Sequence, residues 1–141
     1  MKKMTQQGIT LIVVVIAVAL LSGCLREQPI YNVTDRRFPL SVSNQLTLDD
    51  VAEAISKAGK GRNESWNFKR ESTNLMIAEL FIRQHSAKVQ IPFSEDKFSI
   101  TYADSAVLRY DGKNIHRNYN KWVKFLEEDI VREVNKAAAV K

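Results

Sequence analysis

Few residues in the chain belong to the types that usually perform catalysis or bind metal ions. The 141 residues include one cysteine, Cys24, and two histidines, His85 and His116. The sequence contains no glycine-rich phosphate loop and no CxxC, HExxH or GxSxG pattern. The histidines could be grouped with Asp104 and Ser105 as a triad, but any chain of this length contains such a set by chance. Two histidines without a close second ligand also make a poor metal site. The sequence therefore predicts no catalytic residue, no metal and no dissociable cofactor.

The region between residues 102 and 122 is rich in side chains that suit recognition of a protein or a glycan. Three tyrosines and a tryptophan are interspersed there with charged and amide side chains. Aromatic, arginine and amide groups together are common at binding surfaces. The candidate recognition residues are Asp104, His116, Arg117, Asn118, Tyr119 and Asn120. The alternative interpretation places the aromatic rings in the core and assigns the polar residues to helix caps and turns.

Cys24 lies at the end of an apolar N-terminal segment. Lys2 and Lys3 are followed by thirteen uncharged residues at 9–21, and the sequence LSGC occupies 21–24. A membrane-spanning helix needs about 20 apolar residues, so this run has the length of a signal-peptide core rather than of a permanent anchor. The small residues at 22 and 23 would let a peptidase approach the backbone closely. A thiolate is also a far better nucleophile than a serine hydroxyl.

The order of these features resembles the bacterial lipoprotein precursors, whose lipobox is a branched apolar residue, two small residues and a cysteine. The resemblance implies cleavage between Gly23 and Cys24, diacylglycerol on the sulfur and an acyl chain on the new α-amine. Leu25 follows the cysteine where aspartate favours retention in the inner membrane, so the resemblance implies the periplasmic face of the outer membrane, with the inner membrane as the alternative. The stretch at 98–130 also resembles small uncharacterised proteobacterial lipoproteins, which implies no activity.

Besides a retained transmembrane segment, which thirteen apolar residues fit poorly, two other interpretations of the N-terminus remain open. One is an ordinary secretory signal in which the cysteine lies at the cleavage site by chance. The other is a prepilin-like leader, because GITLI at 8–12 is similar to the pilin cleavage motif. Pilins carry glutamate where this chain has Val13, and their apolar helix continues past the point at which this one meets LSGC.

Composition and punctuation predict the domain organisation. Hydrophobic residues make up 45% of the chain, enough for a globular core. Removal of two lysines with the signal leaves 19 basic against 16 acidic side chains, which is too small an excess to indicate nucleic-acid binding. Residues 25–40 lack regular periodicity and contain Pro29 and Pro39, so we expect a tether. The predicted units are a signal peptide at 1–23, a lipidated N-terminus and tether at 24–40, and one globular domain at 41–141.

Hydrophobic spacing predicts two helices. The first runs from 48 to 57, with Thr47 as its N-cap and Gly59 after its end, and it carries apolar residues at i, i+3, i+4 and i+7. The second is the C-terminal helix, capped by Asn118 or Asn120. Its predicted apolar face consists of Tyr119, Trp122, Val123, Leu126, Ile130 and Val134.

Alternating apolar and polar residues predict strands between the two helices. They lie near 66–69, 76–83, 87–93 and 98–102, with a four-residue turn at 94–97 and an optional further strand at 107–110. An antiparallel sheet with one apolar face needs a cover, and two amphipathic helices provide it. We therefore expect an α+β two-layer sandwich of three or four antiparallel strands and two helices, in the order α-β-β-β-(β)-α.

The sequence thus favours a lipid-anchored, non-enzymatic binding or scaffolding module of the cell envelope. Its expected partners are the membrane and an envelope protein or glycan. The alternatives are a small cell-envelope hydrolase and a pilin-like or secretion-apparatus subunit.

Overall fold

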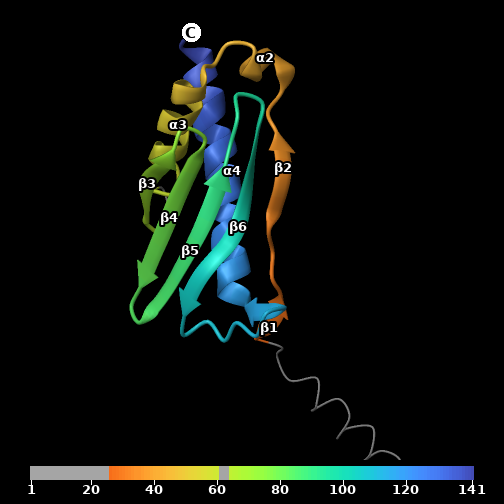
Figure 1. The fold of residues 1–141 in the computed structure, drawn as a ribbon, viewed down its shortest axis with the longest axis vertical. Coiled ribbons are helices and arrows are strands. Elements are labelled where there is room, and N and C mark those ends of the chain that lie inside the picture. The colour runs from red at the N-terminus through yellow and green to blue at the C-terminus, as the bar shows by residue number, and fades with distance from the viewer. Residues whose placement is uncertain (1–25, 61–63) are drawn as a thin grey trace, which may run out of the picture.

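The computed structural model describes residues 26–60 and 64–141. The predicted signal peptide, the predicted cleavage site and Cys24 lie outside the described residues. Figure 1 shows the elements in their order along the chain. They are β1 (Glu27–Pro29), β2 (Val33–Arg37), α2 (Leu40–Ser43), α3 (Leu48–Lys57), β3 (Trp66–Ser72), β4 (Leu75–Ile82), β5 (His85–Pro92), β6 (Lys97–Ala106), β7 (Asn114–His116) and α4 (Arg117–Ala139).

The centre of the fold is a five-stranded antiparallel sheet in the order β2-β6-β5-β4-β3. Strands β3 to β6 form a meander of successive hairpins, and β2 is added beside β6 (Figure 1). The segment at 76–83 also suited a helix by its apolar spacing, and the prediction of a strand there is confirmed by β4. In β4, Met76, Ala78 and Leu80 are buried and alternate with more exposed residues, as expected for a sheet with one covered face.

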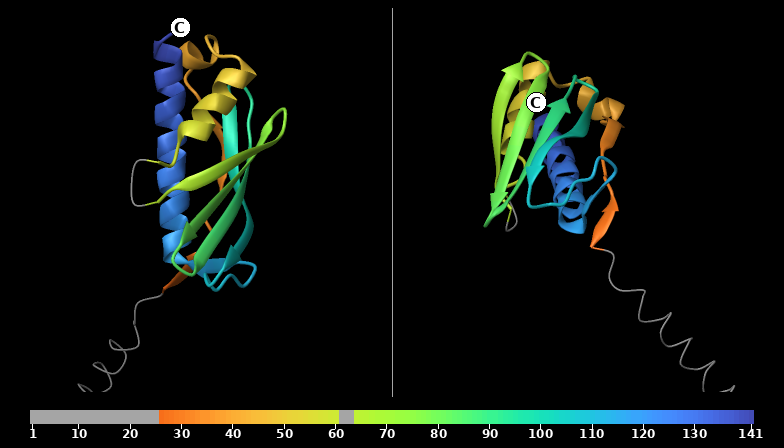
Figure 2. Two further views of the ribbon diagram at one scale, coloured as in Figure 1. Left: turned by 90° about the vertical axis from the view of Figure 1, so that its left-hand side faces the viewer. Right: turned by 60° about the horizontal axis from the view of Figure 1, so that its bottom comes forward.

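Helices α3 and α4 cover one face of this sheet, as the side view in Figure 2 shows. The predicted apolar face of the C-terminal helix is buried in full. Its N-cap is His116, and not Asn118 or Asn120, because β7 ends at this residue and the helix begins directly after it. The expected α+β fold, an antiparallel sheet covered by helices, is therefore confirmed, with five strands in the sheet and a separate pair formed by β1 and β7.

Helix α3 begins at the predicted cap. The Thr47 hydroxyl accepts a hydrogen bond from the Asp50 amide at 3.2 Å, and the Asp50 carboxylate accepts one from the Thr47 amide at 2.9 Å. This reciprocal capping box satisfies two backbone donors that the first helical turn leaves free. Gly59, after the helix, has a φ of +65°, a conformation that glycine adopts without strain.

The segment expected to be an irregular tether instead belongs to the fold from Glu27 onward. β1 pairs with β7, and β2 pairs with the long strand β6. Backbone pairing holds both strands, and Val33 is the only residue in them that is buried. The sequence of these strands therefore has no apolar periodicity from which they could be predicted. A bulge at Asp35, whose φ is +47°, further disturbs the alternation in β2.

The prediction of an optional strand at 107–110 is wrong. The chain bends there, with Leu108 buried and its neighbours Val107 and Arg109 at φ values of +61° and +53°. Left-handed residues cannot continue a strand. Among the described residues, no helix is both long and apolar enough to cross a membrane.

Candidate functional site

The aromatic residues of the candidate recognition region form a packed cluster. The Tyr102 ring lies 4.1 Å from the Tyr110 ring and 5.7 Å from the Tyr119 ring, measured between centroids. Tyr119 is completely buried, and its hydroxyl has no hydrogen-bond partner among the described residues. Burial raises the pKa of Tyr119, so this hydroxyl stays protonated at all ordinary pH values. Tyr119 is therefore a core residue and presents no surface to a partner.

Asn120 is also structural. Its side chain is buried, donates a hydrogen bond to the Pro29 carbonyl at 2.8 Å and accepts one from the Tyr31 amide at 2.9 Å. These two bonds attach the segment between β1 and β2 to the first turn of α4. The alternative interpretation, in which the polar residues serve as caps and turn ligands, thus describes this residue correctly.

The remaining candidate residues lie at the surface or at element ends. His116 Nδ1 accepts a hydrogen bond from the Asn118 amide at 3.2 Å, and Asp104 accepts one from the Ser105 amide at 2.8 Å. Arg117 is exposed. The structure therefore brings the six residues to one end of the molecule without placing their functional groups around a common point.

The residues that could form a triad, the histidines with Asp104 and Ser105, do not form it: Ser105 and His116 make hydrogen bonds to other groups. The Ser105 hydroxyl lies 3.0 Å from the Tyr102 hydroxyl, while His116 is occupied as a helix cap. Burial, and to a smaller extent the nearby His85, lowers the pKa of His116. In the part of the chain that the structure describes, no three His, Cys, Asp or Glu side chains gather to hold a metal ion.

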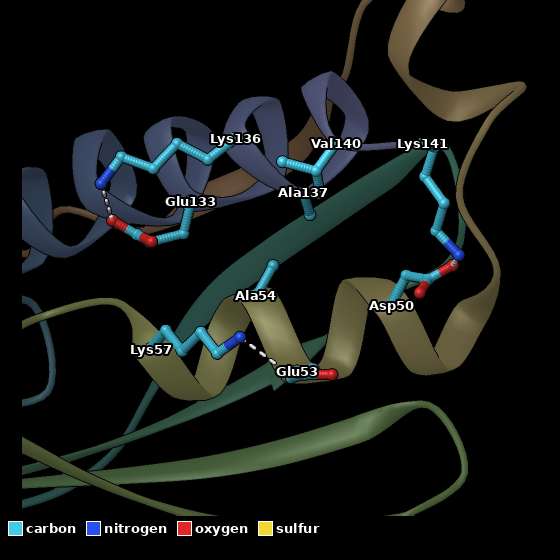
Figure 3. Close-up of a pocket in the computed structure, with 9 residues that line it drawn as sticks. All are labelled: Asp50, Glu53, Ala54, Lys57, Glu133, Lys136, Ala137, Val140 and Lys141. Atoms are coloured by element: carbon cyan, nitrogen blue, oxygen red, sulfur yellow. Dashed lines mark hydrogen bonds and ion pairs between the residues drawn. The ribbon is translucent and has the colours of Figure 1, made fainter.

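A shallow hollow lies between α3 and α4 near the C-terminus (Figure 3). Ala54 and Ala137 point toward one another across it, and its volume is about 300 Å³. Its rim consists of ion pairs: Lys57 to Glu53 at 2.5 Å, Lys136 to Glu133 at 2.8 Å and Lys141 to Asp50 at 3.0 Å. These charges neutralise one another within the rim, so the hollow offers no net charge to a ligand.

The uncovered face of the sheet is a larger candidate surface, which we call the open sheet face. It contains a hollow of about 540 Å³. Aligned rows of residues cross it from β3 to β6, and Ile77 lies between Lys69 and Gln90 in one such row. The hollow is lined by Asn67, Phe68, Lys69, Glu71, Leu75, Ile77, Glu79, Lys88, Gln90 and Ala103.

Charged pairs frame the apolar residues of the open sheet face. Lys88 lies 2.6 Å from Glu79, and Lys69 lies 3.0 Å from Glu71. Half-exposed aliphatic groups surrounded by charges are typical of surfaces that contact other proteins. Sequence reasoning recognised the alternation in these strands but did not select this face. The available signal was the aliphatic residues, such as Ile77, at polar-face positions.

Comparisons of the chain with protein-family models, with curated proteins and with solved structures find no match.

Proposed function

We propose that the chain is a bacterial lipoprotein precursor, cut between Gly23 and Cys24 and held by lipid on Cys24 to the periplasmic face of the outer membrane. The observation that carries the proposal is LSGC at 21–24, directly after a basic and then an apolar segment. The anchor consists of diacylglycerol on the sulfur and an acyl chain on the α-amine. Each buried methylene contributes about 0.8 kcal/mol, so three chains hold the protein far more firmly than one.

If Cys24 is acylated as proposed, the domain lies close to the anchored residue. The described fold starts at Arg26, only two residues after Cys24, and the Arg26 carbonyl accepts a hydrogen bond from the Arg117 amide at 2.7 Å. Two residues span at most about 7 Å. The domain of an acylated chain would therefore lie directly against the membrane, without an intervening flexible tether.

We further propose that the domain is a non-enzymatic binding or scaffolding module. The candidate catalytic groups Ser105 and His116 make structural hydrogen bonds. The open sheet face, by contrast, presents aliphatic side chains between charged pairs, which suits contact with an envelope protein or glycan.

Replacement of Cys24 by serine tests the anchor. In the wild type we expect a mature chain that starts at position 24, carries lipid mass and fractionates with the membrane. Cys24→Ser removes the nucleophile, so this variant should stay uncleaved and lack lipid, as read by intact mass spectrometry. Ser22→Ala keeps a small residue in the lipobox and is expected to be processed like the wild type.

Two results would contradict the proposal. One is a Cys24→Ser chain with unchanged processing, mass and fractionation. The other is an N-terminus that begins after Gly8, which would indicate the prepilin-like alternative.

A further inference from the structure

One end of the domain collects the segments that lie nearest to Cys24, and we call it the anchor-end surface. The described chain begins there, beside β1, the β4–β5 turn, the β6–β7 connection and the start of α4 (Figures 1 and 2). Backbone contacts join these segments: the His116 amide donates to the Leu108 carbonyl, and β5 residue Ser86 pairs with β6 residue Ala106. The surface comprises Phe81, Arg83, Val107, Arg109, Tyr110 and Arg117.

Large hydrophobic side chains are exposed on the anchor-end surface. Phe81 is 64% exposed, Val107 56% and Tyr110 39%. The other two exposed large hydrophobic side chains among the described residues, Leu40 and Val140, belong to α2 and to the end of α4, at the opposite end of the molecule (Figure 1). Exposed apolar groups gathered in this way indicate contact with a partner or a membrane.

The backbone that presents these side chains is unusual. Val107 and Arg109 in the β6–β7 connection, and Arg83 in the β4–β5 turn, all have positive φ values, from +53° to +61°. A left-handed conformation is rare for a β-branched residue such as Val107. Because Val107 is exposed, burial of its side chain in the core does not account for this strained conformation.

Cations surround the exposed apolar groups. Five cationic side chains lie around this end of the domain, compared with three carboxylates, those of Glu27, Asp104 and Asp111. Glu27 already pairs with Arg109 at 3.0 Å, and Asp111 accepts hydrogen bonds from the backbone amides of the β6–β7 connection. The cations are Arg26, Arg83, Arg109, Lys113 and Arg117. Basic residues next to exposed apolar groups are the combination that anionic bilayers attract.

We propose that the anchor-end surface rests on the anionic phospholipid surface of the same bilayer that holds the acylated Cys24. Phe81 and Val107 enter the interfacial region, and the arginines contact lipid phosphates. This orientation rests on the proposed lipidation, which brings Arg26 to within about 7 Å of the anchored cysteine.

The orientation makes a geometric prediction. Helix α4 has 23 residues, about 35 Å, and runs from the anchor end to the opposite end of the domain (Figure 1). Amphipathic elements enter a membrane by about 5–10 Å. The anchor-end side chains are therefore within reach of the lipid, while Leu40, in α2 at the far end, is not.

Site-directed fluorescence on the full acylated chain tests the orientation. Cys24 is the only cysteine, and its acylated sulfur is not free to react, so an introduced cysteine can be labelled selectively. Three variants, each with one introduced cysteine, are labelled with a fluorophore on that cysteine: Val107→Cys, Phe81→Cys and Leu40→Cys. Each labelled chain is bound to vesicles that contain lipids with a fluorescence quencher on the headgroup. In vesicles of phosphatidylcholine and phosphatidylglycerol, the labels at 107 and 81 should lose emission, and the label at 40 should not. In pure phosphatidylcholine the loss should be smaller.

A charge-reversal pair tests the role of the arginines. Arg83→Glu with Arg117→Glu should reduce the loss of emission at position 107 to the level in pure phosphatidylcholine. Lys136→Glu with Lys141→Glu makes the same change in net charge at the far end of the domain and should leave the loss at position 107 as it was.

Several outcomes would overturn the orientation. Equal quenching at 107 and 40 would show that the domain turns freely about its anchor. No quenching at 107 and 81 would show that the anchor-end surface does not contact the membrane, and its exposed apolar side chains would then indicate a protein or glycan partner. Quenching that does not depend on phosphatidylglycerol would remove the role of the arginines. A wild-type chain that takes up the fluorophore at Cys24 would instead contradict the lipidation, and the orientation would lose its premise.

Discussion

At Gly59 the backbone has a φ of +65°, and a Cβ placed on this residue would lie 2.6 Å from Cδ1 of Trp66. Trp66 is itself only 2% exposed and packs in the core, so its ring has little room to move. Two independent physical reasons, backbone conformation and steric space, therefore require glycine at this position.

We expect Gly59→Ala to destabilise the fold by about 3 kcal/mol, because it combines left-handed strain with overpacking against Trp66. Urea unfolding measures the change. Gly112→Ala is the matched control: its φ is +95°, but nothing lies within 4 Å of the added Cβ. A cost at Gly59 no larger than at Gly112 would show that the Trp66 contact is unimportant.

Individual residues of the candidate site were less predictable than Gly59. Residue types at 102–122 suited both a recognition surface and a core with caps, and only burial separates the two. Tyr119 is fully buried and Asn120 is 6% exposed, whereas Arg117 is exposed on the same helical turn. The spacing along a short stretch of sequence does not reveal which side of a helix start is covered by a segment from 89 residues earlier.

At the scale of elements, helix α3 shows how local chemistry sets a boundary. The pKa of Asp50 falls from 3.8 to about 2, first because the Thr47 amide donates to its carboxylate, and then because of the Thr47 hydroxyl and Lys141. A lowered pKa means that the folded state favours the charged carboxylate. Its contribution to stability is therefore fully present above the unfolded pKa, near 3.8, and is lost as the pH falls toward 2.

We expect Asp50→Asn to be less stable than the wild type at pH 7, because the charge that the capping box and Lys141 stabilise is gone. The difference in the free energy of unfolding should disappear between pH values of about 4 and 2. Urea unfolding at a series of pH values measures it. Thr47→Ser keeps the capping hydroxyl and should retain the wild-type pH dependence; a pH-independent difference for Asp50→Asn would contradict the argument.

The predictable elements carry their own signals. Helix α3 has its cap and apolar stripe, and β4 to β6 are eight to ten residues long and alternate buried with more exposed residues along much of their length. β1, β2 and β7 are three to five residues long and are held mainly by backbone pairing with distant strands. Because backbone hydrogen bonds are common to all residue types, such strands leave little trace in the sequence.

At the scale of the whole molecule, the segment at 26–37 connects the site of the proposed anchor to the domain. Besides β1 and β2, it is held by Asn120, which bonds to the Pro29 carbonyl and the Tyr31 amide. The Tyr31 hydroxyl also donates to Glu127 at 2.7 Å. These contacts join residues about 90 positions apart and make the segment part of the domain.

Asn120→Ala should lower the free energy of unfolding by about 1–3 kcal/mol, because the part-buried Pro29 carbonyl and Tyr31 amide both lose their hydrogen-bond partner. Amide hydrogen exchange should rise in the segment from β1 to β2 before it rises in β4 and β5. Asn118→Ala, two residues earlier at an exposed position, is expected to change neither quantity. Equal rates of amide hydrogen exchange between β1 and β2 in the two variants would show that Asn120 does not hold this segment in place.

The sequence by itself determined the local features: the α3 cap, the apolar face of α4, the alternation of β4 to β6, and the lipobox pattern on which the proposed anchoring depends. These depend on neighbours within a few residues, so spacing reveals them. Only the tertiary structure decided that residues 27–37 belong to the domain, that Tyr119 is core, and that Phe81 and Val107 share one end with Arg26. Those facts depend on long-range pairing and packing, which bring together residues whose separation in the chain carries no periodic signal.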